Sequence, residues 1–365
     1  MILPNIDQQV CDKTTHGKLV KIIESTFIGE TLSRAKVLYL IENCTLEELV
    51  FLELKANEVR YESYKNLVYL RGLIEFSNYC KQNCHYCGIR NDNKNVDRYR
   101  LTLEEIFYCV QEGYNLGYWT FVLQAGDDPY FNTERLCAIM KKIKSTYGDV
   151  AITLSIGEMD KVSYQKIYDA GCDRYLLRHE TGSTRLYKHL HPNDMSLSNR
   201  KRCLEDLRDI GFQVGCGFMV NTPTQKNKDL VEDFIFIQEF QPDMCGIGPY
   251  LSHSNTPLWG NESGTINQVR FCVALTRLLV KKALLPSTTA LATVDEKGRE
   301  TILKAGANVI MPNLSPTSLR ERYEIYEGKV WLGDEAAEGH SNIEKKIESI
   351  GFKVDMQIGH VAGWR

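Results

Sequence analysis

The sequence of 365 residues lacks features that would assign it to several large protein classes. It contains no apolar run of the ~18 residues that a membrane-spanning helix needs. Residues 1–9 contain no charged segment followed by an apolar one, which speaks against a secretory signal peptide. The net charge is only −3, so there is no basic field for nucleic acid. These absences favour a cytoplasmic protein with no membrane and no nucleic acid among its partners.

Low-complexity linkers are also absent, and disulfides are not expected. Twelve cysteines in a long chain without a secretory signal indicate a reducing compartment, where disulfides are rare. Most of them are scattered and are best interpreted as small buried hydrophobic residues. Hydrophobic residues make up 43% of the chain, which is enough for a large core.

Three cysteines stand together as a CxxxCxxC motif: Cys80, Cys84 and Cys87, with Tyr86 just before the last. Three thiolates at this spacing can ligate three irons of a 4Fe–4S cluster and leave the fourth open, whereas an electron carrier normally has all four capped. Structural zinc wants four ligands in paired knuckles, and only His85 is nearby. The motif resembles the signature of the radical S-adenosylmethionine (SAM) enzymes, in which the open iron chelates SAM. A metal-binding scaffold is the non-enzymatic alternative.

A repeated order of helix, glycine and short apolar run predicts the fold. Capping boxes at 45–48 and 102–105 begin helices, and a glycine after a helix precedes a buried strand in several repeats. Parallel strands are expected near 68–77, 119–125, 150–157, 173–179, 213–220, 244–250, 285–290 and 308–313. This pattern predicts an α/β fold, a (βα)8 TIM-type barrel over residues 61–327. Residues 1–60 are expected to form an N-terminal helical cap at the barrel bottom, and residues 328–365 a C-terminal extension with a helix near 342–350.

Catalytic residues of such barrels lie at the C-terminal ends of the strands. The first predicted strand leads directly into the cysteine loop. The second ends in Gln124-Ala-Gly126-Asp127, which resembles the glycine-glycine-glutamate segment that meets the SAM ammonium in radical SAM enzymes. An ordinary turn explains this segment equally well.

The fourth predicted strand carries Arg174, Arg178 and Glu180 at alternating positions, so we expect all three to face the same side. Buried charges are costly unless they are paired or bound to a ligand. The three residues therefore predict either a mixed-charge pocket in the lumen or a structural ion pair. Arg200, at the start of the next helix, offers a bidentate fit to the SAM carboxylate.

The later strands offer backbone space and hydroxyl groups. Gly215 and Gly217 precede Met219, and glycines in a strand allow a ligand, here the adenosyl group, to approach the backbone. Thr288 and Thr289 supply hydroxyls for a polar substrate or an anion.

Longer segments resemble the HydE family of radical SAM maturases of FeFe hydrogenase. The segments are residues 74–80, 98–100, 175–181, 246–249, 288–290 and 307–313. In this resemblance Gln124, Ser155, Glu180 and Arg200 match positions around SAM, and Arg178, Thr288 and Thr289 match positions that line the cavity. It implies a barrel with SAM over the cluster and assembly of the dithiomethylamine-bridged di-iron subcluster. The implied substrate is a cysteine-ligated iron carbonyl cyanide complex. The implied partners are an electron donor such as ferredoxin or flavodoxin, and other hydrogenase maturases.

Two departures from the family pattern stand out. Some members hold a second cluster with three C-terminal cysteines, but residues 331–346 contain none, so a single cluster is predicted. A family tyrosine after the eighth strand corresponds to Leu319, with Tyr323 and Tyr326 nearby.

Two other radical SAM activities are alternatives. A sulfur-insertion enzyme of the biotin synthase type needs inward thiols for a second cluster, and residues 151–157 contain no cysteine. A mutase of the methylornithine synthase type would rearrange lysine. The segments around the cysteine loop and the fourth strand fit HydE better.

Overall fold

A parallel barrel forms the centre of the computed structural model, which describes residues 13–329 and 336–364. Six strands pair in the order β2 (Gly72–Ser77), β3 (Thr120–Ala125), β4 (Ala151–Ser155), β5 (Arg174–Leu176), β6 (Gln213–Val220) and β7 (Met244–Pro249). A second sheet places β1 (Leu67–Leu70) between β8 (Val309–Ile310) and β9 (Lys353–Asp355). Parallel bridges at Met244–Leu284, Pro286–Val309 and Leu73–Asn313 connect the two sheets. The α/β barrel predicted from the sequence is confirmed.

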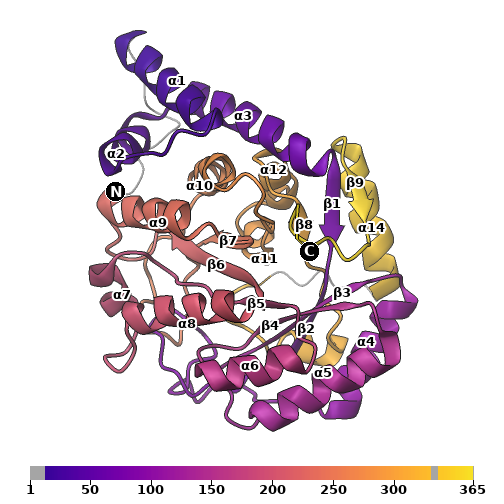
Figure 1. The fold of residues 1–365 in the computed structure, drawn as a ribbon. Coiled ribbons are helices and arrows are strands. Elements are labelled where there is room, and N and C mark those ends of the chain that lie inside the picture. The colour runs from indigo at the N-terminus through magenta and orange to yellow at the C-terminus, as the bar shows by residue number, and fades with distance from the viewer. Residues whose placement is uncertain (1–12, 330–335, 365) are drawn as a thin grey trace.

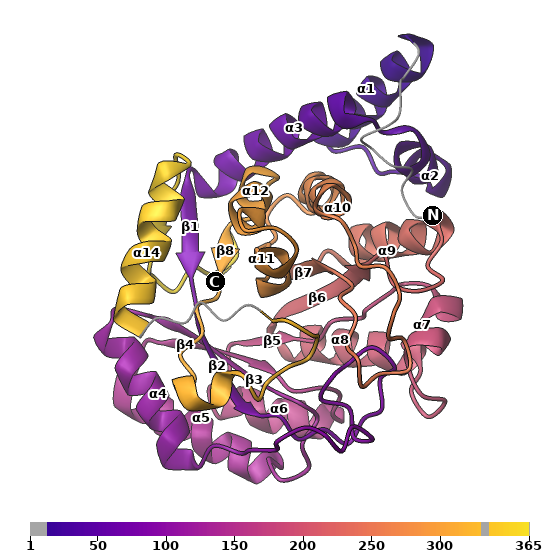
Figure 2. The same cartoon turned by 180° about the vertical axis from the view of Figure 1, so that it is seen from behind.

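Helices connect the strands and cover the outside of the barrel (Figures 1 and 2). They are α4 (Leu103–Asn115), α5 (Thr133–Tyr147), α6 (Lys161–Asp169), α7 (Thr184–Leu190), α8 (Leu197–Ile210), α9 (Asn227–Phe240), α10 (Ile266–Leu279), α11 (Thr289–Val294) and α12 (Gly298–Lys304). The predicted capping box of α4 is present: the Thr102 hydroxyl accepts from the Glu105 amide at 3.2 Å, and the Glu105 carboxylate accepts from the Thr102 amide at 2.7 Å. Within the described ranges, no helix is long and apolar enough to cross a membrane.

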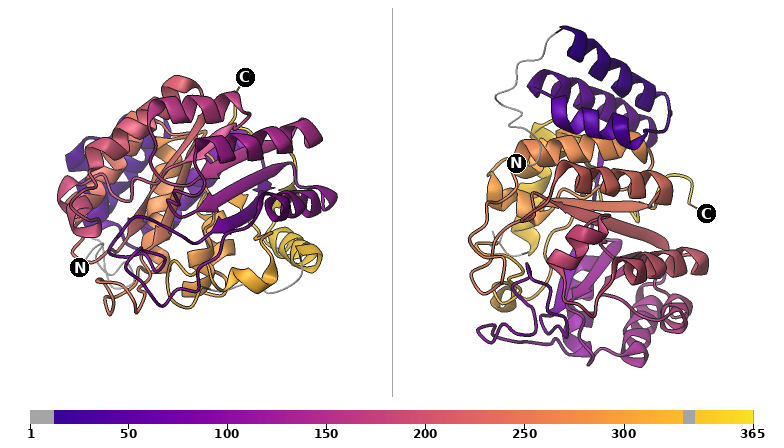
Figure 3. Two further views of the ribbon diagram at one scale, coloured as in Figure 1. Left: turned by 90° about the horizontal axis from the view of Figure 1, so that it is seen from below. Right: turned by 90° about the vertical axis from the view of Figure 1, so that its left-hand side faces the viewer.

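The N-terminal region is helical, as expected, with α1 (Lys13–Phe27), α2 (Arg34–Asn43) and α3 (Leu46–Tyr64). The second predicted capping box, between Thr45 and Glu48, begins α3. Helix α3 packs along α10, and α2 packs along α9, so the three helices form a layer on one side of the barrel (Figure 3). The predicted boundaries of this region and of the C-terminal extension, which holds α14 (Ala336–Ser349), stay predictions. Residues 1–12 and 330–335 lie outside the described residues.

The C-terminal tail lies across the lower end of the barrel. The Ile358 carbonyl accepts hydrogen bonds from the Thr120 hydroxyl and from Arg174 Nη2, both at 2.8 Å. The Val361 amide donates to Gln213 Oε1 at 3.0 Å. We expected residues 1–60 to cap this end, but these contacts with inward-facing barrel residues come from the tail.

Two predicted strands differ in detail from the observed ones. The run 68–77 is divided at Arg71 into β1, which pairs with β8, and β2, which pairs with β3. The run 285–290 contains one isolated bridge, between Pro286 and Val309, and α11 begins at Thr289. Pro286 has no N–H to donate to a ladder, and Thr288 is already the N-cap of α11.

Arg277 connects the outer helices to the barrel wall. Its side chain is fully buried in α10 and donates to the carbonyl oxygens of Gly306 at 3.0 Å and Ala283 at 2.6 Å. It also donates to Asn308 Oδ1 at 3.2 Å. Burial lowers the pKa of Arg277 to about 9, because no carboxylate offsets its desolvation. The guanidinium therefore satisfies several buried acceptors at once.

We expect Arg277→Met to lower the free energy of unfolding by roughly 2–3 kcal/mol, because the carbonyl groups that it serves lose their donor. Urea denaturation followed by circular dichroism measures this change. Arg135→Met, at an exposed arginine of α5, is the matched control and should leave the midpoint nearly unchanged. Equal midpoints for both variants would contradict this role.

Candidate functional site

The cysteine loop follows β2 and is clamped by its own side chains. Arg98 donates to the carbonyl oxygens of Ile89 and Arg90, both at 2.8 Å. Asn78 Oδ1 accepts from the Tyr99 amide at 2.8 Å, which joins the two ends of the loop. The loop therefore has a fixed conformation although it contains no helix or strand.

Cys80, Cys84 and Cys87 are free thiols of intermediate exposure on this loop. Burial raises the pKa of Cys80 and raises that of Cys84 to about 12, and the neighbouring Cys80 thiol adds to the effect on Cys84. Metal coordination deprotonates such thiols outright. A single zinc ion with bonds of about 2.3 Å would draw its ligands close together. Among the described residues, these sulfur atoms do not all lie within 4.8 Å of one another. The three sulfur atoms are therefore not held as close together as the ligands of one zinc ion.

A cavity of about 300 Å³ lies next to the loop, inside the barrel. Most of the predicted site residues line it: Tyr86, Cys87, Gln124, Ser155, Arg178, Glu180, Arg200, Met219, Thr288 and Thr289. They come from the cysteine loop and from several different strand ends and helix starts. The barrel therefore brings together residues that lie up to about 200 positions apart in the sequence.

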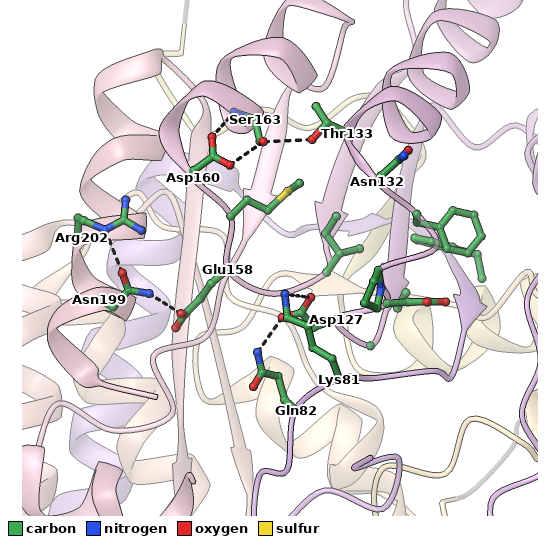
Figure 4. A pocket seen from close by; sticks show the side chains of 18 residues that line it. Lys81, Gln82, Asp127, Asn132, Thr133, Glu158, Asp160, Ser163, Asn199 and Arg202 are labelled. Atoms are coloured by element: carbon green, nitrogen blue, oxygen red, sulfur yellow. Dashed lines mark hydrogen bonds and ion pairs between the residues drawn. The ribbon is translucent and has the colours of Figure 1, made fainter. Parts of the chain in front are cut away.

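Gly126 and Asp127 do not line this cavity. They line an outer pocket of about 530 Å³, seen in Figure 4. The Asp127 carboxylate accepts from Gln82 Nε2 at 2.9 Å and lies 3.1 Å from Lys81 Nζ. A Cβ on Gly126 would lie 2.2 Å from the Tyr79 carbonyl oxygen. Both residues hold β3 against the cysteine loop, and their contact with SAM stays a prediction.

Two ion pairs meet in the cavity wall. Arg178 Nη2 lies 3.2 Å from Glu180 Oε2. Arg200 Nε donates to Glu158 Oε1 at 2.5 Å, and its Nη1 donates to the Arg178 carbonyl at 2.6 Å. Among the described residues, Arg178 Nε and Thr288 Oγ1 are buried without a hydrogen-bond partner. Such groups are costly unless a ligand satisfies them, so they mark this wall as a binding surface.

Arg174 does not share this pocket, contrary to the prediction from strand alternation. It is buried at the base of the barrel, where it donates to the Ile358 carbonyl, and burial lowers its pKa to about 10. Strand β5 ends at Leu176, so strict alternation does not continue to Arg178 and Glu180.

The backbone at Glu180 is in the left-handed region, with φ of +64°. This conformation is uncommon for a residue with a side chain and must be held by its surroundings. Behind it, Asp233 of α9 accepts from the Gly182 amide at 2.5 Å and lies 3.4 Å from His179 Nε2. Burial raises the pKa of Asp233 and lowers that of His179, which favours an uncharged pair. These two groups fix the segment that presents Glu180.

Gly215 and Gly217 do not provide the space for a ligand that we expected from the sequence. A Cβ on Gly217 would lie 2.1 Å from the Gly246 carbonyl oxygen, and one on Gly215 would lie 2.6 Å from the Leu176 side chain. Gly215 and Gly217 therefore permit packing between neighbouring strands, whereas Gly246 and Gly248 of β7 line the cavity.

Comparison with known proteins agrees with this site. The model of the radical SAM superfamily matches residues 74–237. The FeFe hydrogenase maturase subunit HydE of Thermotoga maritima is 43% identical over 298 residues, which cover 82% of this chain and 85% of that protein. The chain belongs to the HydE family of radical SAM enzymes.

Solved structures show the same fold. Methylornithine synthase (PylB) aligns with a TM-score of 0.79 and 24% identity over 92% of this chain and 97% of that one. The FeFe-hydrogenase maturase HydG of Carboxydothermus hydrogenoformans aligns with a TM-score of 0.77 and 20% identity over 94% and 80%. As a member of the radical SAM superfamily, the enzyme uses a 4Fe–4S cluster and SAM.

The sequence did not point to two residues of this radical SAM cavity, Glu75 and Lys329. Tyr323 and Tyr326, which the sequence analysis named, also line it, whereas Leu319 packs against the hydrophobic core. A glutamate inside an otherwise apolar strand was a signal that could have identified Glu75. Lys329 had no local signal, because it meets Glu75 across 254 residues.

We expect Asp233→Leu to raise the dissociation constant for SAM about tenfold, which corresponds to ~1.4 kcal/mol. The substitution removes the acceptor of the Gly182 amide and releases the strained segment at Glu180. Titration calorimetry on the cluster-loaded enzyme measures the effect, and Asp233→Asn should retain more affinity because it keeps an acceptor oxygen. Asp243→Asn is the control, since Asp243 accepts from the Val214 amide at the start of β6. SAM binding by Asp233→Leu at the wild-type affinity would refute this positioning role.

Proposed function

We propose that the enzyme holds one 4Fe–4S cluster through Cys80, Cys84 and Cys87, cleaves SAM, and acts on a cysteine-ligated iron carbonyl cyanide complex during assembly of the hydrogenase di-iron subcluster. The observation that carries the proposal is that Cys87 lines the same cavity as the Arg178–Glu180 pair and Thr288. Identity of 43% with a HydE maturase supports the choice among radical SAM activities.

When bound and reduced, the cluster supplies the electron that splits SAM into methionine and a 5′-deoxyadenosyl radical. The chain's own residues bind and orient the reactant. Arg200 offers a guanidinium to the SAM carboxylate, and Glu180 offers a carboxylate to its ammonium. Gln124 and Ser155 add polar contacts, and Met219 adds an apolar one.

The cavity supplies a largely apolar environment for the reactive carbon. Leu73, Leu177 and Ile325 line it, and apolar side chains limit the water around a reactive group. Arg178 Nε and Thr288 Oγ1, buried without partners in the described part of the chain, are donors suited to an anionic ligand such as cyanide. The partly buried hydroxyl groups of Thr289 and Tyr326, 3.0 Å apart, add to this polar side of the cavity.

The proposed partners follow from the chemistry. The cluster needs an electron donor of the ferredoxin or flavodoxin type, and the substrate must come from another hydrogenase maturase.

We expect the enzyme, reconstituted anaerobically with iron and sulfide, to bind about four irons per chain and to form 5′-deoxyadenosine from SAM and dithionite. Cys84→Ala should abolish this product, because one iron loses its ligand. Cys137→Ala, at a partly exposed thiol outside the loop, is the matched control and should remain active.

The substrate is tested in a second step. When the cysteine–iron complex is added, the amount of SAM cleaved should rise in proportion to the amount of complex converted. Lysine, in contrast, should give no rearranged amino acid. A methylornithine product from lysine would replace the proposed substrate by that of the mutase. One zinc per chain with no SAM cleavage would leave only a metal-binding scaffold.

A further inference from the structure

A buried ion pair lies in the cavity wall that β2 provides. Glu75 Oε1 is 2.6 Å from Lys329 Nζ, and their side chains are only 1% and 3% exposed. Asn313 Nδ2 donates to Glu75 Oε2 at 2.8 Å, and Lys329 Nζ donates to the Tyr323 carbonyl at 3.0 Å. Both charged residues line the cavity. None of the roles assigned above to the SAM site uses them.

Stability alone does not account for this pair. Removing two charges from water costs more than their attraction returns unless the geometry is excellent, and a packed apolar pair would serve a core equally well. Leu73, Met311 and Ile325 show that the cavity wall accommodates apolar side chains. A charged pair placed in such a wall indicates a ligand that carries charges of its own.

The pair lies beside the predicted SAM residues. In the strand register Glu75 is opposite Gln124, and Gln124 is opposite Ser155. Gln124 Nε2 also donates to the Tyr323 hydroxyl at 3.3 Å, so Gln124 and Lys329 both contact the same tyrosine. A molecule bound next to SAM therefore meets Glu75 and Lys329.

We propose that Glu75 and Lys329 recognise the amino-acid head group of the substrate, with Glu75 facing its ammonium and Lys329 facing its carboxylate. The inference rests on the proposed function, which supplies a substrate that contains cysteine. A carboxylate has about four acceptor sites. Lys329 donates to Oε1 of Glu75, and Asn313 donates to Oε2. A zwitterion next to the pair places opposite charges side by side, and their attraction is strengthened because the cavity excludes water.

The test uses cluster-loaded, SAM-bound enzyme and three thiols in titration calorimetry. L-Cysteine carries both charges, cysteamine only the ammonium, and 3-mercaptopropionate only the carboxylate. Glu75→Gln should lower the affinity for cysteamine at least tenfold and leave the affinity for 3-mercaptopropionate unchanged or higher. Lys329→Met should lower the affinity for 3-mercaptopropionate at least tenfold and leave the affinity for cysteamine unchanged or higher. Both variants should lower the affinity for L-cysteine.

The opposite responses separate recognition from a structural role. A merely structural pair predicts that each variant changes both single-charge probes in the same direction, and that result would overturn the proposal. The double variant Glu75→Gln/Lys329→Met, with iron content and circular dichroism measured, guards against a folding defect. It should bind L-cysteine poorly but SAM normally. Glu53→Gln is the matched control, because Glu53 pairs with Arg270 at 2.7 Å outside the cavity.

The two proposals can fail separately, because the thiol probes test the head-group site and turnover of the iron complex tests the proposed function. Opposite shifts for the two probes, together with no turnover of the complex, would support the head-group site and refute the proposed function. Normal turnover of the complex without opposite shifts would support the proposed function and refute the head-group site.

Discussion

Charged side chains inside a closed barrel must be neutralised there, and this constraint organises the interior of the molecule. Three pairs meet it around the cavity: Arg178–Glu180, Arg200–Glu158 and Glu75–Lys329. The Arg200–Glu158 and Glu75–Lys329 pairs join segments that are distant in sequence, so these two pairs also fix the position of a cavity wall. Burying such groups costs desolvation energy, which the partner charge and the additional hydrogen bonds of each pair offset.

The lower end of the barrel meets the same constraint differently. Arg71 and Arg174 are buried there, and burial lowers the pKa of both guanidinium groups. The positive charge of Arg174 lowers the pKa of Arg71 further. The carbonyl groups of Ile358 and Gly359 accept from them, at 2.8 and 3.2 Å. The C-terminal tail thus covers this end of the barrel, and its backbone carbonyl dipoles stabilise the two arginines. The charged floor and the reactive cavity are consequently separate layers of one barrel.

The sequence predicted what is encoded locally. The capping boxes, the cysteine loop and most strand positions depend on residues a few positions apart, so pattern and spacing were sufficient. Arg174 was misplaced because strand alternation was extended past the end of β5, where Glu180 takes a left-handed conformation. Gly217 was interpreted as ligand space because a strand glycine leaves room, and the sequence does not show that the backbone of β7 fills it. Lys329 was missed because its partner lies 254 residues away.

This division between local and distant contacts has a functional consequence. In the function proposed above, cluster chelation depends on one short loop, so its motif can be recognised from the sequence. The proposed substrate recognition depends on walls built from β2, β5, α11 and the segment after β8, which a short motif does not describe. The 24% identity with methylornithine synthase shows a shared barrel and leaves the substrate open. Residues that distinguish substrates are therefore expected where distant segments meet, and the buried contact between Glu75 and Lys329 is such a place.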